Sequence, residues 1–210
     1  MSDSIDLPDI VPVMPLPGAS LFPHALLPLF IFEQRYRSML EHALGAHRMF
    51  CVAMIQPPQS AWDSPLDFRQ IATIGLIRAC VGRDDGTSHL ILQGLQRVRF
   101  TGFIQEKPFP LAAFAPLTST AGASAAESEA LAVKVLELYT RFKNSGRRFP
   151  EKVDRYLAEL GDPEMLADLM AATFITDPVR RQHLLEELTI SQRLRLVLQY
   201  LREETGDAAS

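Results

Sequence analysis

Apolar residues in the first half of the chain come in short runs separated by prolines and glycines. Runs of strand length between turn-forming residues are typical of β-strands that are buried on one or both faces. The pattern predicts strands at residues 11–16, 26–30, 49–55, 71–81, 88–95, 97–104 and 111–117. A helix is expected near 33–44, where apolar residues recur at helical spacing before Gly45.

The second half of the chain has a helical pattern. Twelve of the fifteen prolines lie before residue 118, and proline interrupts helices and lacks a donor for strand pairing. Asp162-Pro163 and Asp177-Pro178 each place a capping acid before a proline at the first helical position. Thr189 opens a capping box that Gln192 would complete. We expect about five helices here.

Between these two patterns lies a small, polar stretch with little to bury, at residues 119–126. The expected organisation is a β-rich lobe over 8–118 and a helical bundle over 127–205, with 119–126 as a linker and 206–210 as a flexible tail. Many short strands with proline turns suggest a barrel or sandwich. The fold class is therefore α+β.

Composition narrows the class of protein. Hydrophobic residues make up 47% and charged residues 22%, as in soluble globular proteins. The net charge of −4 disfavours nucleic acid as a partner. No apolar run approaches the ~18 residues of a membrane span, and the acidic N-terminus lacks the order of a secretory signal, so we expect a cytoplasmic protein without membrane contact. Cys51 and Cys80 lie in apolar runs and are expected to be buried thiols.

The residues that usually carry catalysis are not arranged for it. None of the four lysines follows a glycine, as a phosphate-binding loop requires, and no Gly-x-Ser-x-Gly elbow occurs. The five histidines lack the paired spacing of a zinc site. We therefore expect no enzyme activity and no catalytic residue, cofactor or metal.

Residues 56–68 form a long loop that contains the single tryptophan. Long loops often carry function, and a loop aromatic can anchor a peptide. Trp62 and Phe68 are thus candidate peptide-binding residues. The alternative is that the loop folds back and buries its aromatic rings as a plug.

Several arginines have simpler explanations. Arg35 and Arg37 stand beside Glu33 at a predicted helix start, where the acid favours the helix dipole and the arginines can pair with it or with nearby carbonyls. Arg97 and Arg99 alternate with apolar residues on a predicted strand, which places them on the opposite face.

One set of motifs resembles a known family. Leu16-Pro17, Leu21-Phe22-Pro23, Pro28-Leu29 and Ile31 to Arg37 are similar to the opening signature of the Lon protease substrate-binding (N-terminal) domain family. Further similar segments follow in the family's order: Ile74-Gly75-Leu76-Ile77, Gly94 to Val98, Leu166-Ala167-Asp168-Leu169, Arg181 to Glu186, and Gln192-Arg193-Leu194. His24 departs from the pattern, since many members have glycine there.

The resemblance implies a PUA-like, mostly antiparallel β-barrel lobe followed by a helical bundle. It also implies a non-catalytic module, associated with proteolysis, that binds unfolded or partly folded polypeptides. Because the 210 residues hold neither the family's ATPase nor its peptidase, one form of this role is an adaptor for a separate ATP-dependent protease. Two alternatives are a PUA-like RNA-binding protein and a small-ligand site in the cleft between the lobes.

Overall fold

The computed structural model describes residues 6–144, 155–157 and 159–205. The chain divides into two compact units, residues 1–117 and 118–210, and each is described by itself. The first is built around a β-sheet and the second around helices, which confirms the predicted α+β class.

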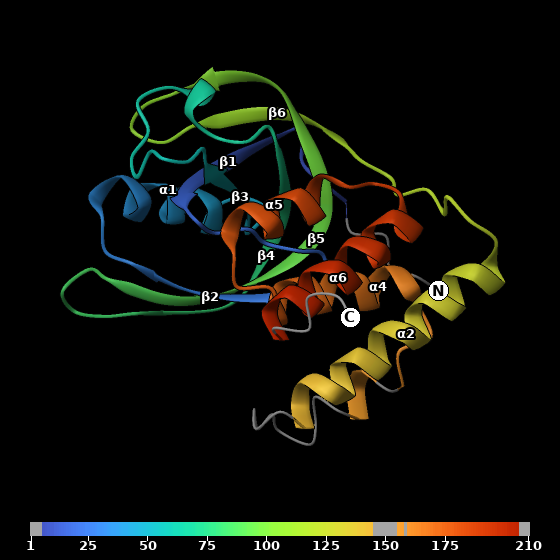
Figure 1. The fold of residues 1–210 in the computed structure, drawn as a ribbon. Helices are drawn as coiled ribbons and strands as arrows, with labels where there is room; N and C mark the ends of the chain where they lie inside the picture. The colour runs from blue at the N-terminus through green and yellow to red at the C-terminus, as the bar shows by residue number, and fades with distance from the viewer. Residues whose placement is uncertain (1–5, 145–154, 158, 206–210) are drawn as a thin grey trace. The chain divides into compact units, whose positions relative to one another are not determined.

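The first unit contains six strands in one sheet (Figure 1). They are β1 (Ile10–Pro17), β2 (Leu26–Ile31), β3 (Met49–Ile55), β4 (Ile71–Gly82), β5 (Ser88–Gln105) and β6 (Leu111–Pro116). The strand order is β2-β5-β4-β3-β1-β6, and β6 also pairs with β5. This second pairing closes β5, β4, β3, β1 and β6 into a barrel, in which only the β1–β3 pair is parallel.

The strands predicted at 88–95 and 97–104 are one strand, β5. Its first part pairs with β2 and its last part with β6, so one long strand serves both the barrel and an extension outside it. Gly94 lies where the two parts meet, and a Cβ there would stand 2.0 Å from the carbonyl oxygen of Phe22. Only glycine allows the backbone to pass this closely.

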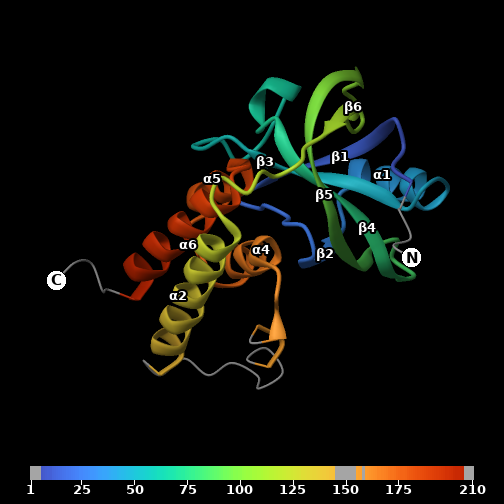
Figure 2. The ribbon, with the colours of Figure 1, turned by 90° about the vertical axis from the view of Figure 1, so that its right-hand side faces the viewer.

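Alternating residues of the central strands face two apolar clusters. Val13 and Cys51 belong to a cluster completed by the loop before β4, whereas Met14 and Phe50 belong to a second cluster on the opposite face. The helix α1 (Gln34–Leu44) covers the second cluster and lies beside β1 (Figure 2). Because both faces of these strands are buried, apolar residues occupy consecutive positions along them.

The charged residues at the start of α1 have the structural roles that the sequence predicts. Arg35 forms an ion pair with Glu33 at 2.8 Å, and Arg37 donates from Nε to the carbonyl oxygen of Phe32 at 2.8 Å. The helix ends before Gly45, as predicted.

The second unit contains α2 (Ala125–Asn144), α4 (Pro163–Phe174), α5 (Pro178–Glu186) and α6 (Ile190–Thr205). Helix α6 contacts each of the other three. Asp162 and Asp177 cap α4 and α5 as predicted, by accepting backbone N–H donors. The predicted capping box at α6 is different: the N–H of Thr189 donates to the Glu187 carboxylate, not to Gln192. None of the described helices is long and apolar enough to cross a membrane.

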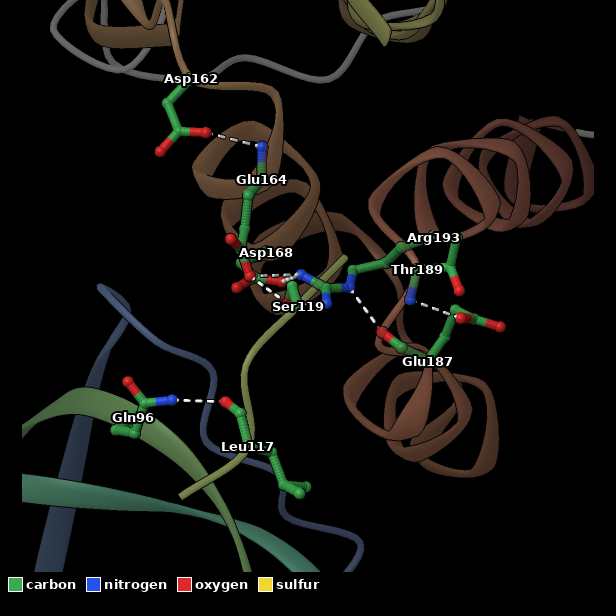
Figure 3. Close-up of polar contacts among 9 residues, drawn as sticks. All are labelled: Gln96, Leu117, Ser119, Asp162, Glu164, Asp168, Glu187, Thr189 and Arg193. Atoms are coloured by element: carbon green, nitrogen blue, oxygen red, sulfur yellow. Dashed lines mark hydrogen bonds and ion pairs between the residues drawn. The ribbon is translucent and has the colours of Figure 1, made fainter. Parts of the chain in front are cut away.

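Hydrogen bonds hold the chain on both sides of residue 118, where the segment predicted as a linker begins (Figure 3). In the first unit, Leu117 accepts a hydrogen bond from the Gln96 amide. In the second unit, Ser119 accepts a hydrogen bond from the guanidinium of Arg193 at 2.8 Å. The same guanidinium pairs with Asp168 at 2.9 Å, and both of these side chains are fully buried. The predicted tail, 206–210, lies outside the described residues.

Candidate functional site

An exposed apolar surface lies on the part of the sheet that extends outside the barrel. Here β2, the first part of β5 and the end of β4 form a three-stranded layer, and the β4–β5 hairpin projects beside β2 (Figure 1). Every residue of β2 is apolar. Leu27, Leu29 and Ile31 face the cluster beneath α1, so the alternate residues Leu26 and Phe30 face outward.

These three strands enclose a hollow of about 340 Å³, which we name the hairpin groove. Its lining is Pro28, Leu29, Phe30, Ala79, Val81, His89, Leu90 and Ile91. The strand register explains this gathering, because Pro28 lies opposite Ile91, and His89 lies opposite both Phe30 and Val81. Val81 is 65% exposed and Phe30 is 47% exposed. Such a patch usually marks a site of interaction in a soluble protein.

Aromatic rings continue the apolar surface along one side of the groove. Phe30 stacks on His89, with ring centroids 4.7 Å apart, and on Phe32 at 5.7 Å. The guanidinium of Arg83 lies 6.0 Å from the centroid of Phe30. These contacts pack the Phe30 ring against its neighbours along the side of the groove.

The outer edge of β2 is the end of the strand order, so no described strand pairs with it. The N–H of Gly94 donates to the carbonyl of Ala25 at 2.9 Å, and bonding residues alternate along an antiparallel pair. The odd-numbered residues of β2 therefore bond to β5, and Leu26, Pro28 and Phe30 direct their backbone groups to the free edge. Since Pro28 has no N–H, it removes the middle donor of that edge. This favours docking of side chains in the groove over addition of another strand.

Trp62 and Phe68 lie elsewhere, in the interior of the barrel unit. Trp62 is 3% exposed and Phe68 is 0% exposed. Their rings meet edge to face with centroids 6.1 Å apart, and the indole N–H donates to the Tyr36 hydroxyl at 3.3 Å. Lys107 covers the indole from 4.4 Å. The loop thus folds back as a plug, and the predicted role of these two residues in peptide binding remains untested.

The remaining candidates, namely the cysteines, a metal site and the strand arginines, show no catalytic arrangement in the described residues. Both cysteines are free, and burial raises the pKa of the Cys51 thiol, which makes it a poor nucleophile. Nowhere in the described ranges do three or more histidine, cysteine or acidic side chains gather as a metal site would need. Arg99 is exposed, whereas Arg97 is only 2% exposed, which strand alternation alone does not reveal.

Sequence reasoning did not identify the hairpin groove. The available signal was that Leu26 to Ile31 contains six consecutive apolar residues around a proline. Proline is found mainly on edge strands, and an edge strand that is apolar on both faces exposes one of them. The partner residues Val81 and His89 could not have been assigned without the register of β4 and β5.

The sequence matches one family over almost its whole length. A profile of the substrate-binding domain of ATP-dependent protease La (LON) matches residues 10–203. The Lon protease of Desulfosudis oleivorans is 30% identical over 201 residues, which are 94% of this chain and 24% of that protein. The Lon protease of Roseiflexus castenholzii is 29% identical over 202 residues, which are 96% of this chain and 25% of that protein. The chain thus spans about a quarter of the length of these relatives.

Solved structures agree with the fold. The N-terminal domain of Mycobacterium avium complex Lon protease superposes with a TM-score of 0.73 at 17% identity, covering 95% of this chain and all of that chain. A Lon N-terminal domain protein from Xanthomonas campestris has a TM-score of 0.65 at 20% identity, and covers 91% of this chain and 98% of that chain. At these identities the likeness establishes the arrangement of strands and helices, and the resemblance seen in the motifs is confirmed by the family match.

Proposed function

Because this chain belongs to the substrate-binding domain family of ATP-dependent protease La (Lon), we propose that it binds unfolded or partly folded polypeptides in the hairpin groove. The observation that carries the proposal is the outward apolar face of β2, β4 and β5, centred on Phe30 and Val81. Unfolded chains expose apolar side chains that folded proteins bury, so an exposed apolar groove distinguishes the two.

The shape of the groove suits an extended polypeptide. Alternate side chains of an extended segment point to one side, at a spacing that matches the outward residues of β5. The apolar side chains of a client would enter the groove between β2 and β4, and its backbone would remain largely in water. Binding of this kind depends on the kind of side chain and not on one sequence, as a general recognition module requires.

Catalysis has no part in the proposal. The family match covers the substrate-binding domain, and the polar side chains around the hairpin groove contain no nucleophile paired with a base. The finer role, an adaptor that delivers clients to a separate ATP-dependent protease in the cytoplasm, extends this proposal; the relatives are Lon proteases, and no contact in this structure bears on it. It predicts that adding the chain changes the rate at which such a protease degrades a bound client.

The binding proposal is tested by fluorescence anisotropy of a labelled, permanently unfolded protein, with the same protein in a folded form as a control. We expect saturable binding of the unfolded form only. Phe30→Ser should weaken it about tenfold, because an exposed aromatic anchor commonly contributes about 2 kcal/mol or less to a small interface. Leu66→Ser is the matched control, since Leu66 is 81% exposed but does not line the groove. Equal affinities for Phe30→Ser and wild type would contradict the proposal.

A further inference from the structure

A second, more polar hollow lies on the same outward face of the sheet. Its volume is about 490 Å³, and its lining is Leu7, His24, Arg78, Gln93, Gly94, Leu95 and Gln96. Along β5, His89 and Ile91 line the hairpin groove, and the next residue of that face, Gln93, lines the second hollow. Along β4, Ala79 lines the hairpin groove and Arg78 lines the second hollow. The two hollows therefore adjoin along both strands.

Arg78 reaches this face because of an irregularity in β4. Ile77 pairs with Leu92 and Ala79 pairs with Ile91, so Arg78 has no partner on β5. Such a bulge places two consecutive residues on one face, and both Arg78 and Ala79 are exposed. Without the extra residue, strict alternation from the buried Ile77 would direct Ala79 inward. Bulges commonly redirect a side chain at a site of interaction.

The guanidinium of Arg78 makes no hydrogen bond or ion pair with any residue in the described part of the chain. The other groups that line this hollow are the amides of Gln93 and Gln96 and the imidazole of His24, and none of them is a carboxylate. Asp6 and Asp9, on either side of Leu7, are the acids nearest in sequence to the lining, and neither forms an ion pair with Arg78. The positive charge at this end of the apolar groove is thus available to a partner.

We infer that the hairpin groove prefers polypeptide segments in which an apolar, aromatic-containing stretch is flanked by an aspartate or glutamate, whose carboxylate pairs with Arg78. The inference rests on the proposed function, since it concerns the same occupant. From His89 to Gln93 is four residues of β5, or about 13 Å at 3.3 Å per residue. The acid is therefore expected about four residues from the aromatic side chain that contacts Phe30.

The test uses labelled peptides with an apolar, aromatic core and an aspartate four residues before or after the aromatic residue. Matched peptides carry asparagine in its place, and all are acetylated and amidated, so that the side chain is the only carboxylate. Anisotropy titrations with wild type should give about threefold tighter binding of the better aspartate peptide, in the range of an exposed ion pair. Added salt should reduce this difference.

Arg78→Gln should abolish the preference for aspartate and leave the affinity for the asparagine peptides unchanged. Arg99→Gln removes the same charge from an exposed arginine that lines neither hollow, and should keep the preference. If wild type binds both kinds of peptide equally, or if Arg99→Gln also removes the preference, the inference is overturned and the proposed function stands. If no peptide and no unfolded protein binds, the proposed function itself is overturned.

Discussion

At the scale of single residues, the most consequential group is the buried guanidinium of Arg193. It pairs with Asp168, contacts Glu164 at 3.3 Å, and donates from Nε to the carbonyl of Glu187 and from a terminal nitrogen to Ser119 (Figure 3). A buried charge is tolerated only when it is fully paired. This one residue of α6 joins α4, the C-cap of α5 and the segment that enters the helical unit.

Arg193→Met is therefore expected to lower the free energy of unfolding of the helical unit by about 3 to 5 kcal/mol, because it leaves the carboxylate of Asp168 buried without its cation. The measurement is urea denaturation followed by circular dichroism. The double variant Arg193→Met with Asp168→Leu should recover part of the loss, since it removes both charges. If Arg193→Met alone were as stable as wild type, the Arg193–Asp168 ion pair would not be needed for stability.

His24 is the second residue with a clear consequence. Its φ is +65°, in the left-handed region where side chains are strained and glycine is not. We expect His24→Gly to raise the free energy of unfolding by up to about 1 kcal/mol. His47→Gly is the control, at an exposed site whose φ is not positive, and it should not stabilise. Thermal unfolding of both variants checks this, and a lower melting temperature for His24→Gly would contradict it.

Sequence motifs include Asp168, Arg193 and His24, but they do not show what each of these residues does in the fold. The Leu-Ala-Asp and Gln-Arg-Leu segments contain Asp168 and Arg193, but nothing in the spacing shows that the two side chains meet. The glycine that many family members have at position 24 is explained by the backbone angle. Arg97 shows the limit of alternation, because a local pattern cannot reveal which part of the molecule covers a strand.

At the scale of elements, the loop between β3 and β4 is held by Asp67. Its Oδ2 accepts the backbone N–H groups of Ser64 at 2.9 Å and Asp63 at 2.8 Å, and the Ser64 hydroxyl accepts the N–H of Leu66. The bonds from the backbone of Ser64 and Asp63 lower the pKa of the Asp67 carboxyl below its usual 3.8. The turn they form carries Trp62 and Phe68 into the barrel unit.

The lowered pKa predicts a pH dependence. Because the folded state favours the ionised carboxylate, its contribution to stability is complete above about pH 4 and is lost as the pH falls through the lowered folded-state pKa. Asp67→Asn should therefore be less stable than wild type at pH 7, and the difference should shrink as the pH falls below 4. Thermal melts between pH 2 and 7 check this. Asp63→Asn is the control, and a difference independent of pH would contradict the account.

Trp62 tests whether the loop is a plug. Trp62→Ala should lower the free energy of unfolding by about 3 kcal/mol or more, as loss of a buried indole usually does. Trp62→Phe should cost less, since it keeps a ring against Phe68. Denaturation measures both. A stable Trp62→Ala variant that no longer binds unfolded protein would instead support the peptide-binding role predicted from the sequence.

Most elements could be predicted from the sequence because their patterns are local. The predicted runs at 11–16, 26–30, 49–55 and 71–81 correspond to β1 to β4 within one or two residues. The union of the runs at 88–95 and 97–104 into β5 was not predicted, because the local pattern does not show that one strand pairs first with β2 and then with β6.

At the scale of the whole molecule, the chain has two compact units, and the proposed recognition surface lies on the first. The family and the α+β class followed from motifs spread over the chain. The hairpin groove did not, because it depends on which residues of β2, β4 and β5 lie opposite one another. Interaction surfaces are properties of the assembled sheet, whereas secondary structure is largely a property of the local pattern.

The central claim is that an unfolded polypeptide lies in the hairpin groove, and the most direct test is photo-crosslinking from single positions. A photoreactive residue would replace Val81, in the groove, or Ile104, elsewhere on β5; these side chains are 65% and 62% exposed. We expect an unfolded client to crosslink from position 81 and not from position 104, and an excess of unlabelled client to compete. Equal crosslinking from both positions, or crosslinking from position 104 alone, would contradict the central claim.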